Sequence, residues 1–214
     1  MPKVVEKKSS TLDFSKSIFC NLFFIKNNKG VLELKYAEKI TEEIKYVVRQ
    51  IKFNQMQNIV ADILQSTRIF VAGQGRSGFM MKSFAMRLMH IGFEAYVVGE
   101  TVTPSIKKGD LLLIGSGSGE TESLVAMSLK TKELGAKVAV VTTNTNSTIA
   151  KQAEAIVELK AQAKGDESST STIQPMGSLF EQCLLICLDS IILILMDEKK
   201  KDGNIMFTRH ANIE

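Results

Sequence analysis

The apolar positions of this chain follow two different periods, and their order along the sequence predicts the architecture. Between residues 36 and 65 they recur every three or four residues, which predicts one or two helices. Short runs rich in Val, Ile and Leu then alternate with further helical stretches. Strands are predicted at 69–72, 95–98, 111–114, 137–142 and 155–159, and helices at 78–90, 121–134, 147–153 and 178–196.

This alternation predicts a three-layer α/β fold. Strands that are apolar along their whole length are typical of a parallel sheet covered by helices on both faces. We therefore expect a five-stranded parallel sheet of the flavodoxin or Rossmann kind, with its binding crevice at the carboxyl ends of the strands. We expect one domain over residues 35–214, preceded by an N-terminal extension, residues 1–34, whose composition is compatible with disorder.

A serine-rich loop, GSGSGET at 115–121, follows the third predicted strand. Such a loop directs free backbone N–H groups and the positive end of the next helix at one spot, where Ser116, Ser118 and Thr121 add hydroxyl donors. The loop lacks the Lys of the nucleotide-binding pattern GxxxxGK[ST], so it favours a phosphate on a small molecule. The alternative is a Ser/Gly turn that binds no ligand.

A glycine loop, GQGRSG at 73–78, follows the first predicted strand and opens a helix. It matches GxGxxG, and Glu100 follows the next strand near the position of a ribose ligand, so a nicotinamide-dependent oxidoreductase is one interpretation. Against it, Arg76 and Ser77 suit an anion and a sugar hydroxyl, and a dinucleotide would leave the serine-rich loop without a role. Two loops at neighbouring strand ends instead predict one compact polar ligand held from both sides.

The composition is that of a soluble single domain: 214 residues, 44% hydrophobic, with a net charge of +4. There is no basic block that would indicate nucleic acid binding. The apolar stretch 179–196 approaches the length of a membrane span, but Glu181, Gln182 and Asp189 interrupt it, which favours a buried helix or a subunit interface.

The three cysteines, Cys20, Cys183 and Cys187, lack the spacing of a zinc site, which indicates a reduced, cytoplasmic setting.

Five runs of the sequence carry a family resemblance: GQGRSG at 73–78, FAMRLMHIGF at 84–93, VVGETVTPSIKKGDLLLIGSGSGET at 97–121, QPMGSLFEQ at 174–182 and HANIE at 210–214. On these runs the chain from residue 69 onward resembles the sugar isomerase (SIS) domain, and it closely resembles the 3-hexulose-6-phosphate isomerases within that group. Many SIS proteins share the serine-rich loop, whereas the pairing of QPMGSLFEQ with HANIE is much narrower.

The resemblance implies a SIS-type fold and an isomerase that converts D-arabino-3-hexulose 6-phosphate to D-fructose 6-phosphate through an enediol. It implies a formaldehyde-fixing or detoxifying pathway, the ribulose monophosphate pathway, with a hexulose-phosphate synthase upstream. Such an enzyme needs no nicotinamide, flavin or metal. The apolar stretch 179–196 predicts a homo-oligomer, and the resemblance implies that it is a tetramer. From the composition and the charges within that stretch we expect binding to neither nucleic acid nor membrane. A non-catalytic sugar-phosphate sensor is the other alternative, although sensors of this fold usually carry a DNA-binding module that we do not find here.

Residues of both loops are the expected phosphate and sugar ligands: Gly75, Arg76, Ser77, Ser116, Gly117, Ser118, Gly119 and Thr121. The resemblance assigns the catalytic base to Glu181, which matches the Glu of the family's FEQ motif. Local sequence alone favours a structural role, because Ser178 and Glu181 have the spacing of a capping box at a helix start. Both interpretations are open at the level of sequence.

Two histidines and one polar segment complete the candidates. His90 lies near a predicted helix end and is expected to be structural. His210 lies in a polar tail that sequence alone predicts to be solvent-exposed, whereas the resemblance implies that the tail docks into an active site, that of a neighbouring subunit, where His210 assists at oxygen. Residues 163–177 have almost no apolar content and predict either a lid or an ordinary loop.

Overall fold

The structure is a computed structural model that describes residues 24–26, 32–162, 172–200, 206 and 209. The chain forms two compact units, residues 1–43 and 44–214. In the first unit, strands β1 (Phe24–Lys26) and β2 (Leu32–Leu34) pair antiparallel. The N-terminal extension therefore includes a paired hairpin, which the sequence analysis did not predict, and its remaining residues lie outside the described part of the chain.

The helical stretch at 36–65 forms two helices, α2 (Lys35–Val48) and α3 (Phe53–Gln65). Helix α3 buries Ile59, Val60 and Ile63 on one side, as the three-to-four-residue spacing predicts.

A five-stranded sheet forms the centre of the second unit. Its strands are β3 (Ile69–Gly73), β4 (Ala95–Val97), β5 (Leu111–Gly115), β6 (Lys137–Thr142) and β7 (Ala155–Glu158). They lie in the order β4-β3-β5-β6-β7 and all pair parallel, which confirms the predicted fold class. The chain order changes direction between β3 and β5, and in open α/β sheets this switch point is where ligands bind.

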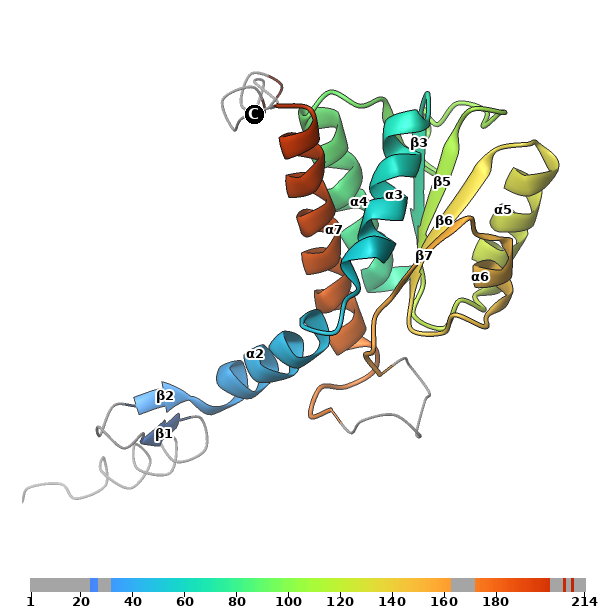
Figure 1. Cartoon of the computed structure of the whole chain (residues 1–214). Helices are drawn as coiled ribbons and strands as arrows, with labels where there is room; N and C mark the ends of the chain where they lie inside the picture. Colours follow the sequence, from blue (N-terminus) through green and yellow to red (C-terminus); the bar gives the residue numbers. More distant parts are fainter. Residues whose placement is uncertain (1–23, 27–31, 163–171, 201–205, 207–208, 210–214) are drawn as a thin grey trace, which may run out of the picture. The chain divides into compact units, whose positions relative to one another are not determined.

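Helices cover both faces of the sheet (Figure 1). Helices α3, α4 (Gly75–His90) and α7 (Ser178–Glu198) lie on one face, and α5 (Glu122–Glu133) and α6 (Thr148–Gln152) lie on the other. Successive strand side chains point to opposite faces, so Val71 joins the core under α3, α4 and α7, whereas Phe70 joins the core under α5 and α6.

Helix α7 is long and apolar enough to cross a membrane by length and composition alone. In the structure it packs against α3 and α4, and half of its most apolar window is buried inside the unit. Cys183 and Cys187 are both buried there, and burial raises the pKa of each thiol to about 12. The prediction of a core helix is therefore confirmed, and Cys20 lies outside the described residues.

An ion pair holds the amino ends of the strands together, at the edge away from the strand ends that carry the glycine loops. Asp110 is fully buried, and Arg68 donates to its two carboxylate oxygens at 3.1 and 2.6 Å. The backbone N–H of Lys107 donates to the same carboxylate at 2.9 Å. The pair therefore joins the end of the connection between β4 and β5 to the start of β3.

Candidate active site

A cleft of about 610 Å³ lies at the carboxyl ends of β3 and β5. Its walls are the glycine loop at 74–77, the serine-rich loop at 115–118 with Thr121, and the turn at 175–178 with Glu181. The two loops singled out from the sequence therefore share one cleft, at the edge where the sheet topology places ligand sites. The third wall comes from the start of α7, about 60 residues further along the chain than the serine-rich loop.

The N-termini of α4, α5 and α7 all meet at this cleft. Their N-cap residues are Gln74, Thr121 and Gly177. Neither the Gln74 nor the Thr121 side chain caps its helix, and Gly177 has no side chain to do so. Helix α6 differs, because the Ser147 hydroxyl accepts from the N–H of Ala150 there. First-turn N–H groups and positive helix ends thus converge on the cleft, which makes it suited to an anion.

Close packing within the turn explains the GxGxxG pattern of the first loop. A Cβ atom on Gly78 would lie only 2.7 Å from the carbonyl oxygen of Gly73, and Gly75 has a φ of 57° that other residues rarely adopt. These glycines let the strand turn directly into α4, which places Arg76 and Ser77 at the cleft.

The serine hydroxyls of the second loop accept hydrogen bonds from the loop backbone. The N–H of Gly119 donates to Ser116 Oγ at 3.1 Å, and the N–H of Glu120 donates to Ser118 Oγ at 3.2 Å. A hydroxyl that accepts one bond still has its own proton to donate. Both side chains can therefore stabilise their loop and donate to a ligand oxygen, Ser116 from a buried position and Ser118 from an exposed one.

The structure contradicts the capping box between Ser178 and Glu181. Helix α7 begins at Ser178 itself, its N-cap is Gly177, and the Ser178 hydroxyl donates to the carbonyl oxygen of Pro175 at 2.8 Å. A box requires Ser178 as the N-cap, but the turn before the helix, in which Met176 adopts a φ of 61°, starts the helix one residue earlier. Glu181 is therefore not a capping residue.

Glu181 instead faces the cleft beside Arg76. Arg76 Nη1 lies 3.1 Å from Glu181 Oε2 and donates to Ser178 Oγ at 2.9 Å. At this distance the two groups form an ion pair, but the Arg76 N–H is not aligned for a hydrogen bond to Oε2. Oε2 is buried, and it has no hydrogen-bond partner among the described residues. Buried carboxylate oxygens are normally hydrogen-bonded, which makes this one a strong candidate for proton transfer.

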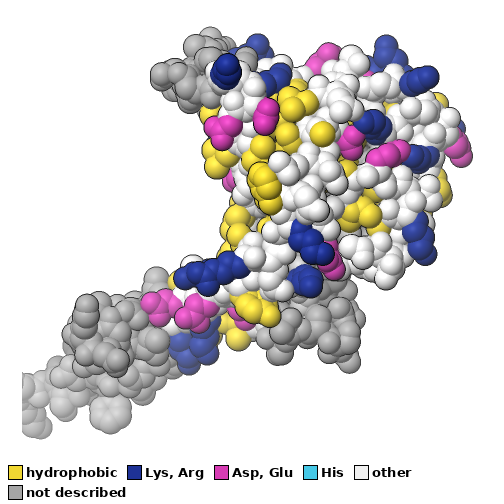
Figure 2. Space-filling model, in the orientation of Figure 1, with side chains coloured by type: hydrophobic (Ala, Val, Ile, Leu, Met, Phe, Trp, Pro, Cys, Tyr) yellow, Lys and Arg dark blue, Asp and Glu magenta, His cyan; other side chains and the backbone are white. Residues whose placement is uncertain are grey.

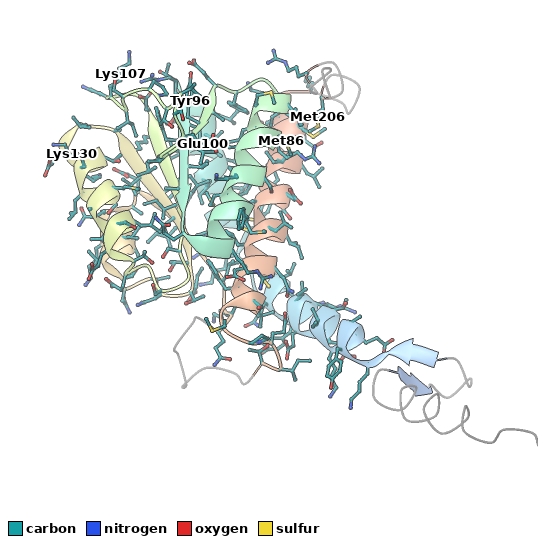
Figure 3. The ribbon with its side chains drawn as sticks, turned by 180° about the vertical axis from the view of Figure 1, so that it is seen from behind. Met86, Tyr96, Glu100, Lys107, Lys130 and Met206 are labelled. Atoms are coloured by element: carbon teal, nitrogen blue, oxygen red, sulfur yellow. The ribbon has the colours of Figure 1, made fainter. Side chains whose placement is uncertain are left out.

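Glu100 does not line the cleft. Glu100, labelled in Figure 3, forms an ion pair with Lys82 of α4 at 3.2 Å, and both side chains are about half exposed. The strand order also differs from that of the dinucleotide-binding fold. Glu100, one of the two features that favoured an oxidoreductase, therefore belongs to a surface ion pair.

The remaining candidates divide into described and undescribed residues. His90 is buried, with its Nδ1 3.4 Å from Arg87 Nη1, in agreement with a structural role. His210 and residues 163–171 of the polar segment lie outside the described part of the chain. Sequence reasoning missed Gln74, whose amide donates to Ser123 Oγ at 3.1 Å across the cleft wall, and Met176 at the rim. Both lie in the matching runs of sequence, but neither has a side chain that suggests chemistry.

Comparison with known proteins agrees with this geometry. The SIS domain family matches residues 62–186. The 3-hexulose-6-phosphate isomerase of Bacillus subtilis is 50% identical over 181 residues, covering 84% of this chain and 97% of the relative. Its namesake from Mycobacterium gastri is 39% identical over 175 residues, covering 82% and 88%. The crystal structure of a Methanococcus jannaschii protein, from which a 3-hexulose-6-phosphate isomerase function was inferred, has a TM-score of 0.74 at 32% identity, covering 85% of this chain and 100% of that one.

Proposed function

Because the chain belongs to the SIS-domain family of 3-hexulose-6-phosphate isomerases, we propose that its cleft interconverts D-arabino-3-hexulose 6-phosphate and D-fructose 6-phosphate. The two sugars differ only in whether the carbonyl is at C3 or C2. The reaction moves one proton between two carbons and one between two oxygens, through a 2,3-enediol. It needs no external oxidant or reductant, because no electrons leave the sugar.

The substrate phosphate binds where the helix N-termini converge. Its charge is met by the backbone N–H groups of the two loops, by hydroxyls of Ser77, Ser116, Ser118 and Thr121, and by the guanidinium of Arg76. Three uncapped helix starts around one cleft support this position. Gly75 and Gly117 allow the backbone to come close to the phosphate oxygens. Gly119, which sequence reasoning also placed at the phosphate, does not line the cleft and packs against Ser147 instead.

Glu181 is the base that carries the proton between C2 and C3. The observation that carries this assignment is that Glu181 lines the cleft while its Oε2 is buried without a hydrogen-bond partner among the described residues. In the forward direction the carboxylate removes the C2 proton, which is acidified by the C3 carbonyl. The enediol forms, and the same carboxyl returns the proton to C3. Arg76 Nη1 lies 3.1 Å from Glu181 Oε2, so its guanidinium stabilises negative charge on the Glu181 carboxylate or on the enediol intermediate.

His210 assists at oxygen by moving a proton between O2 and O3. We assign it to the tail of a neighbouring subunit in a homotetramer. Exposed apolar side chains on the two helices that lie side by side support an oligomer: Phe79 and Met86 on α4 are 64% and 47% exposed, and Leu193 on α7 is 62% exposed. Figure 2 shows hydrophobic side chains gathered along the side of the body where α7 runs. A second copy of the chain would cover them.

The metabolic setting follows from the substrate. A hexulose-phosphate synthase that fixes formaldehyde supplies the 3-hexulose 6-phosphate, and fructose 6-phosphate returns the carbon to sugar metabolism. We place the protein in the cytoplasm, where its three thiols remain reduced.

Deuterium exchange tests this function with a readily obtained substrate. In D₂O, an enediol isomerase should replace the C3 proton of fructose 6-phosphate with deuterium, and the C3–H signal should disappear from the proton NMR spectrum. A sugar-phosphate sensor would also bind fructose 6-phosphate, and the bound sugar would raise the melting temperature of the protein, but the C3–H signal would remain. Binding without exchange, and without conversion of 3-hexulose 6-phosphate, would overturn the proposed activity.

A further inference from the structure

Residues at the end of β6 hold the serine-rich loop from outside the cleft. The carbonyl oxygen of Gly117 accepts hydrogen bonds from Thr142 Oγ1 at 3.0 Å, from Thr143 Oγ1 at 2.9 Å and from the N–H of Thr143 at 3.0 Å. A carbonyl oxygen has two lone pairs, so three hydrogen-bond donors are one more than it has lone pairs to accept with. Neither threonine lines the cleft.

The effect of these donors lies at the other end of the same peptide unit. The Gly117 carbonyl and the Ser118 N–H belong to one trans peptide, so they point in opposite directions. Strand β5 lies between β3 and β6. A carbonyl held toward β6 therefore turns the Ser118 N–H toward the β3 side, where the glycine loop closes the cleft. Among the described residues, none accepts a hydrogen bond from this N–H.

The following residues support the same side of the loop. The N–H of Ile149 donates to the Gly119 carbonyl at 3.2 Å, and the N–H of Thr148 donates to Glu120 Oε1 at 2.8 Å. Hydrogen bonds from Thr148 lower the pKa of the Glu120 carboxyl. The segment 142–149 thus holds the loop at several points, with the densest contacts on Gly117.

We propose that Thr143, together with Thr142, is a positioning residue that aims the Ser118 N–H at the substrate phosphate. This inference rests on the proposed function, because it needs the phosphate to bind at the serine-rich loop. Donors on a carbonyl also polarise the peptide and strengthen its N–H as a donor. The threonine hydroxyls therefore act through Ser118 to orient and strengthen one phosphate contact.

The test compares four proteins: the wild type, Thr143→Val, Thr143→Ser and Thr145→Val. Valine keeps the shape of Thr143 without its hydroxyl, and serine keeps the hydroxyl. Thr145, an exposed residue of the segment 142–149, serves as the control. Calorimetry gives the affinity for fructose 6-phosphate. ¹H–¹⁵N NMR follows the Ser118 amide as inorganic phosphate or fructose 6-phosphate is added, and thermal melts report folding.

We expect the Ser118 amide of the wild type to move downfield with either ligand. In Thr143→Val the affinity should fall about tenfold, the size of one weakened hydrogen bond to a charged group, and the amide response should shrink. Thr143→Ser and Thr145→Val should match the wild type. KM should rise in Thr143→Val while kcat changes little, because the phosphate is remote from the reacting carbons.

Two results would overturn the inference, and only the second would also refute the proposed phosphate position. In the first, the Ser118 amide of the wild type shifts with ligand, and Thr143→Val has the same affinity and the same amide shift. This result would refute the role of the threonines and leave the phosphate site intact. In the second, the Ser118 amide of the wild type does not shift with either ligand, which would refute the phosphate position itself. If Thr143→Val does not fold, Thr143→Ala takes its place in the comparison. Loss of affinity in Thr143→Ser, with an unchanged melting temperature, would also contradict a role for the hydroxyl.

Discussion

At the scale of single residues, Ser116 and Ser118 have the same chemistry but different surroundings. Ser116 is 4% exposed and Ser118 is on the surface, yet each hydroxyl accepts one backbone N–H of the loop. A ligand contact made by either should contribute about 1.5 to 3 kcal/mol, as hydrogen bonds to charged groups do. The cost of removing the loop contact depends on burial, so the two residues should be separable by mutation.

We expect Ser118→Ala to weaken fructose 6-phosphate binding by roughly tenfold or more while leaving the melting temperature nearly unchanged. Ser116→Ala should weaken binding similarly and also lower the melting temperature, because it leaves the N–H of buried Gly119 unpaired. Calorimetry and thermal melts on both variants check this. Unchanged affinity in the Ser116→Ala, Ser118→Ala double variant would remove the serine-rich loop from the phosphate site.

Glu181→Gln tests the base directly. Glutamine keeps the size of the side chain but cannot accept the proton, so turnover should fall roughly 100-fold or more. Stability should barely change, since Glu181 makes no capping bond and its partner Arg76 is 57% exposed. Glu198→Gln, at the exposed far end of the same helix, is the matched control. Near-normal turnover of Glu181→Gln in the conversion of 3-hexulose 6-phosphate would exclude Glu181 as the base.

At the scale of elements, the two ends of the sheet serve different purposes. The carboxyl ends of β3 and β5 carry loops whose donors face the cleft. The amino ends are joined by Arg68 and Asp110, with Asp110 fully buried. The ion pair should therefore matter for folding, and the loops for binding.

Asp110→Ala should lower the free energy of unfolding clearly more than loss of an exposed pair does, because it removes a fully buried carboxylate and leaves Arg68 without its ion-pair partner. The control is Glu133→Ala, which breaks the exposed pair with Lys130 and should cost no more than about 1 kcal/mol. Urea denaturation gives both values. Equal effects of the two substitutions would show that the buried pair has no special structural role.

At the scale of the whole molecule, the proposed site is incomplete in one chain if His210 comes from a neighbour. Purified Glu181→Gln and His210→Ala proteins should each be nearly inactive. When their subunits are mixed and exchanged, some clefts should contain an intact Glu181 and an intact His210, and part of the activity should return. An active monomer in light scattering, or no recovery between subunits proven to exchange, would contradict a shared site.

Much of the fold and part of the site could be predicted from the sequence because they depend on local patterns. Apolar periodicity located all five strands of the sheet and the helices between them, since each element buries one face or both. The glycine and serine loops follow their strands directly, so parallel pairing had to bring them to one edge. Residues 74–77 and 115–118 do line one cleft.

Only the tertiary structure decided features that depend on contacts between distant segments or on backbone conformation. The spacing of Ser178 and Glu181 predicted a capping box, but the turn through Met176 moved the helix start and left Glu181 facing Arg76, more than 100 residues earlier in the chain. The contact of Thr143 with Gly117 exists only because β6 pairs with β5. Local sequence determines which conformations a segment prefers, whereas the neighbours that the fold supplies determine which donors and acceptors meet.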